Sequence, residues 1–139
     1  TSDVVDLYNV RAMAIMGEKH AMQKWSCYPD GWGVLWGATQ RSHYIAYALE
    51  GFWRVGLTAP VEAFMARFAH IVQDAVLMPY VITQDGEGRG ECLAATAQFA
   101  LLLKWMGDRV IADLLIDAAL EQPITRSWEA KWMIDAMLS

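Results

Sequence analysis

Apolar residues recur three and four positions apart along almost the whole chain, which is the spacing of one face of an α-helix. Runs that alternate apolar and polar residues, the mark of a half-buried strand, are missing. The pattern therefore predicts an all-α fold with about six helices. The expected helices cover residues 2–25, 39–55, 58–80, 91–106 and 108–121, and a sixth begins at Thr125 or Ser127 and runs almost to Ser139.

Residues that favour helix ends mark several of these boundaries. Ser2 or Asp3 can cap the first helix and Thr39 the second, because a short side-chain oxygen accepts from free backbone N–H groups. Gly56 and Gly107 follow the second and fourth helices, where glycine tolerates the left-handed conformation that closes a helix. We expect the chain to leave the helical path at these points.

Two segments predict loops. Residues 26–38 combine turn residues with Trp32 and Trp36, and residues 84–90 are rich in glycine and charge. Gly17 is a further candidate interruption, inside the first helix. The other connections are short, which favours antiparallel helical hairpins. Because no Pro-, Gly- or Ser-rich linker divides the chain, we expect a single domain over residues 1–139.

Composition fits a globular protein and argues against two classes of partner. Of the 139 residues, 55% are hydrophobic and 19% are charged, so we expect a buried core rather than disorder. The formal net charge is −5 and there is no basic run, which argues against nucleic acid. No stretch approaches the roughly 18–20 apolar residues of a membrane span, so no membrane partner is expected.

The cysteines and histidines do not form a metal-binding pattern. Cys27 and Cys92 are far apart in the sequence, and His20, His43 and His70 also lack metal-ligand spacing, so no metal or other cofactor is expected. Two lone thiols favour a reducing compartment such as the cytoplasm. Cys92 has two interpretations. A helix N-terminus would lower its pKa, whereas packing between helices would make it an inert buried residue.

The second expected helix has two distinct faces. One carries polar and aromatic residues at steps of four, three and four, namely His43, Tyr47, Glu50 and Arg54. The opposite face carries the apolar residues Ile45, Leu49 and Phe52. We expect the apolar face to pack into the core.

The fourth and sixth expected helices carry comparable stripes. In the fourth the shared face holds Glu91, Ala95, Gln98 and Leu102. In the sixth it holds Trp128, Lys131, Trp132 and Asp135, where the lysine and the aspartate can pair at i, i+4. Alternate helices with such stripes fit an inner ring that faces a shared concave surface. The other interpretation is that each stripe is the solvent side of an amphipathic helix.

Three segments resemble α/α-toroid proteins, which include the six-hairpin glycosidase-like and prenyltransferase-like families. They are residues 90–98 (GECLAATAQ), residues 128–136 (WEAKWMIDA) and residues 45–51 (IAYALEG). The likeness covers about residues 39–138, and a full toroid has about twice as many helices as this chain can form. The resemblance therefore implies a partial toroid, and a two-fold homodimer would be the simplest way to close its ring.

The resemblance implies that a saccharide or another polar small molecule binds the inner face. The candidate catalytic residues are Glu50 and Glu91, because sugar hydrolysis uses paired carboxyl groups. The candidate ligand-binding residues are Trp32, Trp36, His43, Tyr47, Gln98, Trp128 and Lys131. Surface charge remains the alternative for the acids, and core packing remains the alternative for the tryptophans. The competing hypothesis for function is a non-catalytic helical module that self-associates or binds a protein partner.

Overall fold

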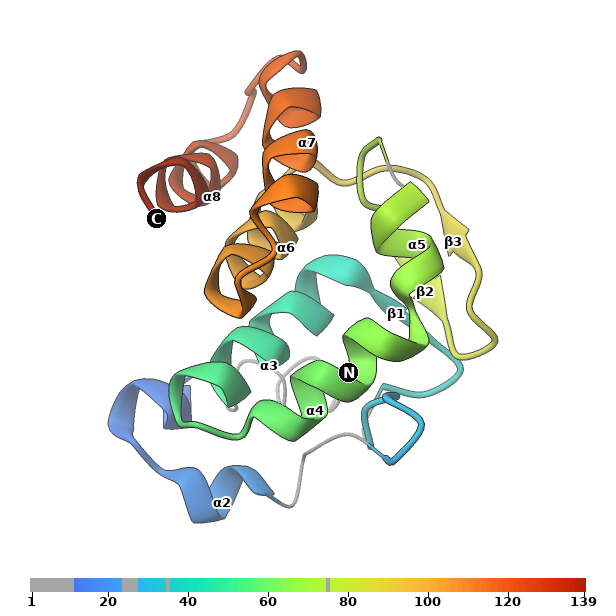
Figure 1. The fold of residues 1–139 in the computed structure, drawn as a ribbon, viewed down its shortest axis with the longest axis vertical. Helices are drawn as coiled ribbons and strands as arrows, with labels where there is room; N and C mark the ends of the chain where they lie inside the picture. Colours follow the sequence, from blue (N-terminus) through green and yellow to red (C-terminus); the bar gives the residue numbers. More distant parts are fainter. Residues whose placement is uncertain (1–11, 24–27, 35, 75) are drawn as a thin grey trace.

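Helices dominate the fold, and a small antiparallel sheet joins them (Figure 1). The structure, a computed structural model, describes residues 12–23, 28–34, 36–74 and 76–139. Its elements in chain order are α2 (Lys19–Gln23), β1 (Thr39–Arg41), α3 (Ser42–Arg54), α4 (Thr58–Arg67), α5 (Ala69–Asp74), β2 (Val81–Thr83), β3 (Gly88–Arg89), α6 (Leu93–Met106), α7 (Arg109–Leu120) and α8 (Ser127–Leu138). The mainly helical class predicted from the hydrophobic pattern is confirmed.

The sheet is a feature that the sequence pattern did not predict. Strand β2 pairs with β1 on one side and with β3 on the other, so that Ile82 lies opposite both Gln40 and Gly88. The expectation of a fold without strands is therefore wrong. Strands of two or three residues are too short to show an alternating pattern, and their stability comes from pairing across the fold. Residues 84–87 form the turn of the β2–β3 hairpin, with Gly86 at φ 91°.

Helix α3 has the core face that was predicted and a different beginning. Ile45, Leu49 and Phe52 are each 0% exposed, so the apolar stripe packs into the core as expected. Thr39 does not cap the helix, because it belongs to β1 and the helix begins at Ser42. The end was predicted correctly, since Gly56 directly follows the C-cap residue and has φ 80°.

The helix expected over residues 58–80 is shorter and broken. Helix α4 ends at Arg67, a separate short helix α5 ends at Asp74, and the chain is extended when it reaches β2. Tertiary hydrogen bonds explain the early end. Met78 N–H donates to Thr96 Oγ1 at 2.9 Å, and Met78 C=O accepts from Cys92 N–H at 2.8 Å. These bonds satisfy the Met78 backbone without a helix.

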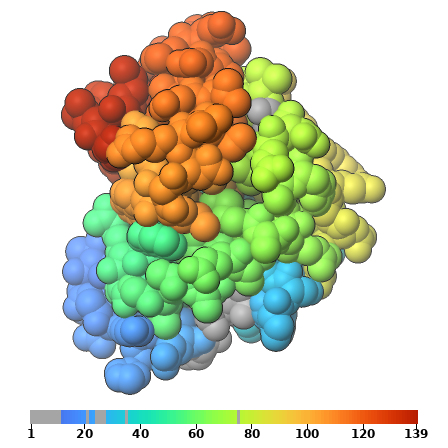
Figure 2. Space-filling view, in the orientation of Figure 1, coloured from blue at the N-terminus to red at the C-terminus, as the bar shows by residue number. Residues whose placement is uncertain are grey.

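Helix α6 is the centre of the C-terminal half. Its residues from Leu93 to Leu103 are all buried, and it packs against α3, α7 and α8. Gly107 ends the helix in the left-handed conformation, as predicted, and the Asp108 side chain caps α7. Figure 2 shows α6 and α7 stacked above α3 and α4 with no separate lobe. A single cluster of buried residues runs from Ala14 to Ala136.

The first expected helix is only partly described. Residues 12–16 and α2 are helical, and Gly17 separates them with φ 76°, so the predicted interruption is confirmed. Met22 is 0% exposed and joins α2 to the core. The candidate caps Ser2 and Asp3 lie outside the described residues. No helix in the described ranges is long and apolar enough to cross a membrane.

Candidate ligand-binding pocket

A pocket of about 300 Å³ opens where the beginnings of α3, α6 and α8 meet the start of β2. This volume is at the small end of the range for ligand sites in proteins. Most of its lining side chains are aromatic or cationic. They are Arg41, His43, Tyr44, Tyr47, Tyr80, Cys92, Arg126 and Trp128.

The His43 ring is the centre of the aromatic lining. Its centroid lies 4.5 Å from the ring of Tyr47, 5.7 Å from Tyr44 and 5.2 Å from Trp128. The ring of Tyr47 in turn meets Trp132 at 5.6 Å, in a T-shaped arrangement. These contacts join α3 to α8 and leave flat, polarisable ring faces along one wall of the pocket.

A buried amide holds His43 from behind. His43 Nδ1 lies 2.6 Å from Gln98 Oε1, and Gln98 is 2% exposed on α6. Because an amide oxygen only accepts, Nδ1 carries the proton in this bond and the ring orientation is fixed. The sequence placed these two residues on different polar stripes, and the fold brings the stripes together.

The guanidinium groups of Arg41 and Arg126 lie over aromatic rings at the pocket. Arg41 Cζ lies 5.6 Å from the Tyr44 ring centroid and 5.4 Å from that of Tyr80, and Nη1 donates to Tyr44 Oη at 3.3 Å. Arg126 Cζ lies 5.6 Å from the Trp128 ring centroid. Both charges are therefore held by cation–π contacts at the rim of the pocket.

Three lining residues occupy the N-cap positions of three helices. Arg41 precedes α3, Cys92 precedes α6 and Arg126 precedes α8. Cys92 Sγ accepts from Ala95 N–H at 3.5 Å, whereas the two arginines make no side-chain cap hydrogen bond. The positive ends of three helix dipoles consequently converge on the pocket.

Burial raises the pKa of the Cys92 thiol above its ordinary value of 9.0. Hydrogen bonds from the N–H groups of Ala95 and Ala94 lower that pKa by less than burial raises it, and the charge of Glu129 adds to the increase. The thiol is 8% exposed. The structure therefore favours the interpretation of Cys92 as a buried, protonated residue over that of a reactive thiolate.

Four of the predicted ligand-binding residues come together here. His43, Tyr47 and Trp128 line the pocket, and Gln98 supports His43 from α6. Lys131 points elsewhere along α8. Its Nζ lies 2.7 Å from Asp135 Oδ2, which confirms the predicted i, i+4 pair, and 3.5 Å from the Trp132 ring centroid.

Trp32 and Trp36 lie in the core next to α4, away from the pocket lining. Both are 2% exposed, and their ring centroids are 5.3 Å apart. The ring of Trp36 meets that of Phe64 at 5.9 Å, and Trp32 Nε1 donates to Gly37 C=O at 2.6 Å. The structure therefore assigns them the packing role that was the alternative interpretation.

The two predicted catalytic acids are separated. Glu50 is 3% exposed and its Oε1 lies 3.1 Å from Arg54 Nε. Glu91 is exposed and lines a different surface hollow together with Leu77, Leu93, Gln122, Pro123, Thr125 and Glu129. The structure thus places no pair of these carboxylates across the pocket of His43.

Sequence reasoning missed Arg41, Tyr44, Tyr80 and Arg126. A signal for the arginines was available, because each directly precedes a serine that begins a helix. The N-cap position normally holds a short polar or acidic side chain, so a basic residue there is an exception to explain. Tyr80 carries no comparable signal, because it approaches the pocket through the sheet that the pattern did not predict.

The described residues and the known proteins give no independent assignment of function. In the part of the chain that the structure describes, no three His, Cys, Asp or Glu side chains are grouped so that they could hold a metal ion. Comparisons with protein-family models, curated proteins and solved structures found no match for this chain. The α/α-toroid resemblance stays a prediction, and the function has to be argued from the pocket.

Proposed function

We propose that the protein binds a small, polar, ring-bearing molecule, such as a monosaccharide unit, in the pocket around His43. The observation that carries this proposal is the convergence of His43, Tyr47 and Trp128 on one concave site. Ring faces give a sugar an apolar surface to stack on, and adjacent hydrogen-bonding groups fix its orientation. The volume of about 300 Å³ suits one such ring.

The segments that resemble α/α-toroid proteins support the choice of a saccharide. Each of the three contributes one residue to the lining of the pocket, namely Tyr47, Cys92 and Trp128. We assign no bond-breaking step, because Glu50 is bound to Arg54 and Glu91 lines another hollow. Their catalytic role stays a prediction.

The test is a titration of isotope-labelled protein with the methyl glycosides of glucose, galactose and N-acetylglucosamine. The indole N–H signals of the tryptophans report binding by NMR. We expect the Trp128 signal to shift, with a dissociation constant on the order of millimolar. The Trp128→Ala variant should lose binding. Trp105→Ala is the control, because Trp105 is a partly buried helical tryptophan that stacks on Arg54 outside this pocket.

A second candidate function, self-association, is favoured by exposed apolar side chains on α7 and α8. Val110 is 72% exposed, Leu114 60%, Ile134 55% and Leu138 83%. Apolar residues at this exposure are typical of interfaces when they are contiguous. We propose a second copy of this chain as the partner, which would also complete a partial toroid.

Light scattering of the wild type and of Leu114→Glu and Ile134→Glu variants tests this candidate. A dimer that either substitution converts to a monomer would support it. A wild type that is monomeric at about 100 μM would rule out an interface of ordinary strength. The two candidate functions can be tested separately, because Trp128→Ala should abolish sugar binding without changing the molecular mass measured by light scattering.

A further inference from the structure

We infer that the pocket holds its ligand by a phosphate group, so that the ligand class is a sugar phosphate or a similar ring-bearing phosphate monoester. This inference rests on the proposed function and narrows it. It depends on the charges at the pocket, whereas the proposed function depends on the aromatic rings.

The first observation is that both pocket arginines lack a carboxylate partner among the described residues. The ion pairs there use four of the seven other described Lys and Arg residues, namely Arg54 with Glu50, Arg67 with Asp30, Arg89 with Glu87 and Lys131 with Asp135. Among the described residues, no Asp or Glu lines the pocket. In a protein of net charge −5, two guanidinium groups without an acid form a local positive site that is left for a ligand.

The second observation is where these arginines are placed. Arg41 and Arg126 occupy N-cap positions, where the helix dipole disfavours a positive charge and favours an anion. A feature that breaks a local rule is expected at functional sites, where binding compensates for it. The beginnings of α3, α6 and α8 add their own positive ends, and phosphate binds well at helix N-termini.

The third observation concerns donors behind the pocket wall. Nε2 of the buried Gln98 amide has no hydrogen-bond partner in the described part of the chain. Glu129 Oε1 accepts from the N–H groups of Thr125 and Arg126, at 3.3 and 3.2 Å. One buried donor on the residue that holds His43 is therefore left without an acceptor among the described residues.

The positive charge at the pocket favours a phosphate over a carboxylate as the anionic group of the ligand. A phosphate monoester carries a charge of about −1.5 to −2 near neutral pH and offers three acceptor oxygens, whereas a carboxylate carries one charge and two oxygens. Two guanidinium groups and three helix N-termini match the first more closely. A ring attached to the phosphate would then contact Tyr47 and Trp128.

Isothermal titration calorimetry with glucose 6-phosphate, glucuronate, glucose and inorganic phosphate tests the inference. We expect glucose 6-phosphate to bind at least about tenfold more tightly than glucose, with glucuronate between them, and to weaken as sodium chloride is raised. Inorganic phosphate should compete with glucose 6-phosphate. Equal affinity for glucose and glucose 6-phosphate would overturn the inference and leave the proposed function intact. Binding of none of the four would overturn both.

Substitutions of single arginines test whether the pocket arginines are the groups that bind the phosphate. Arg41→Gln and Arg126→Gln should each reduce the affinity for glucose 6-phosphate more than the affinity for glucose, so that the preference for the phosphorylated sugar falls by about tenfold. Arg89→Gln is the control, because Arg89 is exposed and pairs with Glu87 on the hairpin. Circular dichroism confirms that each variant is folded. If Arg89→Gln weakens binding as much as the pocket variants do, the attraction is a general surface effect and the inference fails.

Discussion

His43 Nδ1 and Gln98 Oε1, which lie 2.6 Å apart, join α3 to α6 directly behind the aromatic wall of the pocket. Gln98 comes from the buried centre of the fold, and His43 lines the pocket. A hydrogen bond of this kind connects the core to the binding surface. It fixes the plane of the imidazole and makes Nε2 the nitrogen whose protonation changes the charge of the ring.

Gln98→Met should test this connection, because methionine keeps the volume and removes the amide. We expect a loss of about 1–3 kcal/mol in the free energy of unfolding, since His43 loses its hydrogen-bond partner in a partly buried setting. Urea denaturation measures the loss, and the imidazole NMR signals of His43 should change. Gln73→Met, on the exposed face of α5, is the control. Unchanged His43 signals would show that Gln98 does not orient the ring.

The thiol of Cys92 should react slowly in the native protein. Burial raises its pKa above 9.0, so the thiolate fraction at pH 7 is smaller than that of an unfolded thiol, and it rises only as the pH passes that raised value. Iodoacetamide labelling of a Cys27→Ser variant, followed by mass spectrometry, measures the rate. The same variant in urea is the reference. Faster labelling of the native protein at pH 7 would contradict the protonated assignment.

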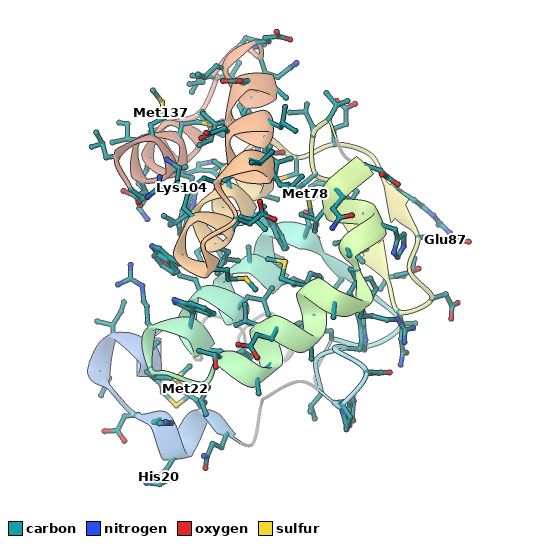
Figure 3. The ribbon with its side chains drawn as sticks, viewed as in Figure 1. His20, Met22, Met78, Glu87, Lys104 and Met137 are labelled. Carbon is teal, nitrogen blue, oxygen red and sulfur yellow. The ribbon has the colours of Figure 1, made fainter. Side chains whose placement is uncertain are left out.

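Lys104 should contribute to the docking of α8. Its Nζ donates to Ala136 C=O at 2.5 Å and to Ser139 C=O at 3.3 Å, and the side chain extends from α6 toward α8 in Figure 3. Lys104→Met removes these bonds and keeps the apolar stem. We expect a loss of about 1–2 kcal/mol, because a cation satisfies the last carbonyls of a helix.

Lys131→Met is the matched control for Lys104. Its ion pair with Asp135 is half exposed on one helix, and such pairs contribute about 0.5 kcal/mol or less. Thermal unfolding by circular dichroism compares the two variants. Equal losses in the free energy of unfolding would mean that Lys104 acts only as a surface charge.

Gly107→Ala should measure how much the positive φ at the end of α6 costs a residue that has a side chain. Gly107 has φ 91°, and a Cβ added there would meet no atom within 4 Å. The expected loss of about 1–2 kcal/mol therefore comes from the backbone conformation alone. Gly107→Asn should lose less, because asparagine adopts this conformation more easily. A neutral Gly107→Ala variant would show that the α6–α7 connection can relax.

The sequence predicted correctly those parts of the fold that are determined by residues close to one another in the chain. Ile45, Leu49 and Phe52 follow helical spacing and are buried, and Gly107 closes α6 because glycine tolerates a positive φ. The break after Arg67 and the sheet around Ile82 have non-local causes. Hydrogen bonds such as Met78 to Thr96 join segments that are distant in sequence, and no short window of residues contains both partners.

The pocket residues divide in the same way, into those that a local sequence pattern identifies and those that only the packing of distant segments brings to the site. His43 and Tyr47 were found because they share one helix face, and Trp128 was found because it begins a comparable stripe. Arg41 was not found, because the expected helix began before it and made it an interior residue. Glu50 was placed with the polar residues of its stripe, but helix packing buries it beside Arg54. The periodicity predicts which face of a helix carries a side chain. Whether that face is exposed to solvent depends on how the neighbouring helices pack against it.

The uninterrupted burial of α6 from Leu93 to Leu103 determines how this protein can change by mutation. An amphipathic helix such as α7 has an outer surface on which substitutions are nearly neutral. Most of α6 has no such surface, since every new side chain there meets α3, α7, α8 or the rest of the core. A saturation library should therefore show an intolerant block of eleven consecutive positions in α6 and a periodic tolerance in α7. Variation that adapts the pocket should accumulate around this block, at the beginnings of α3 and α8.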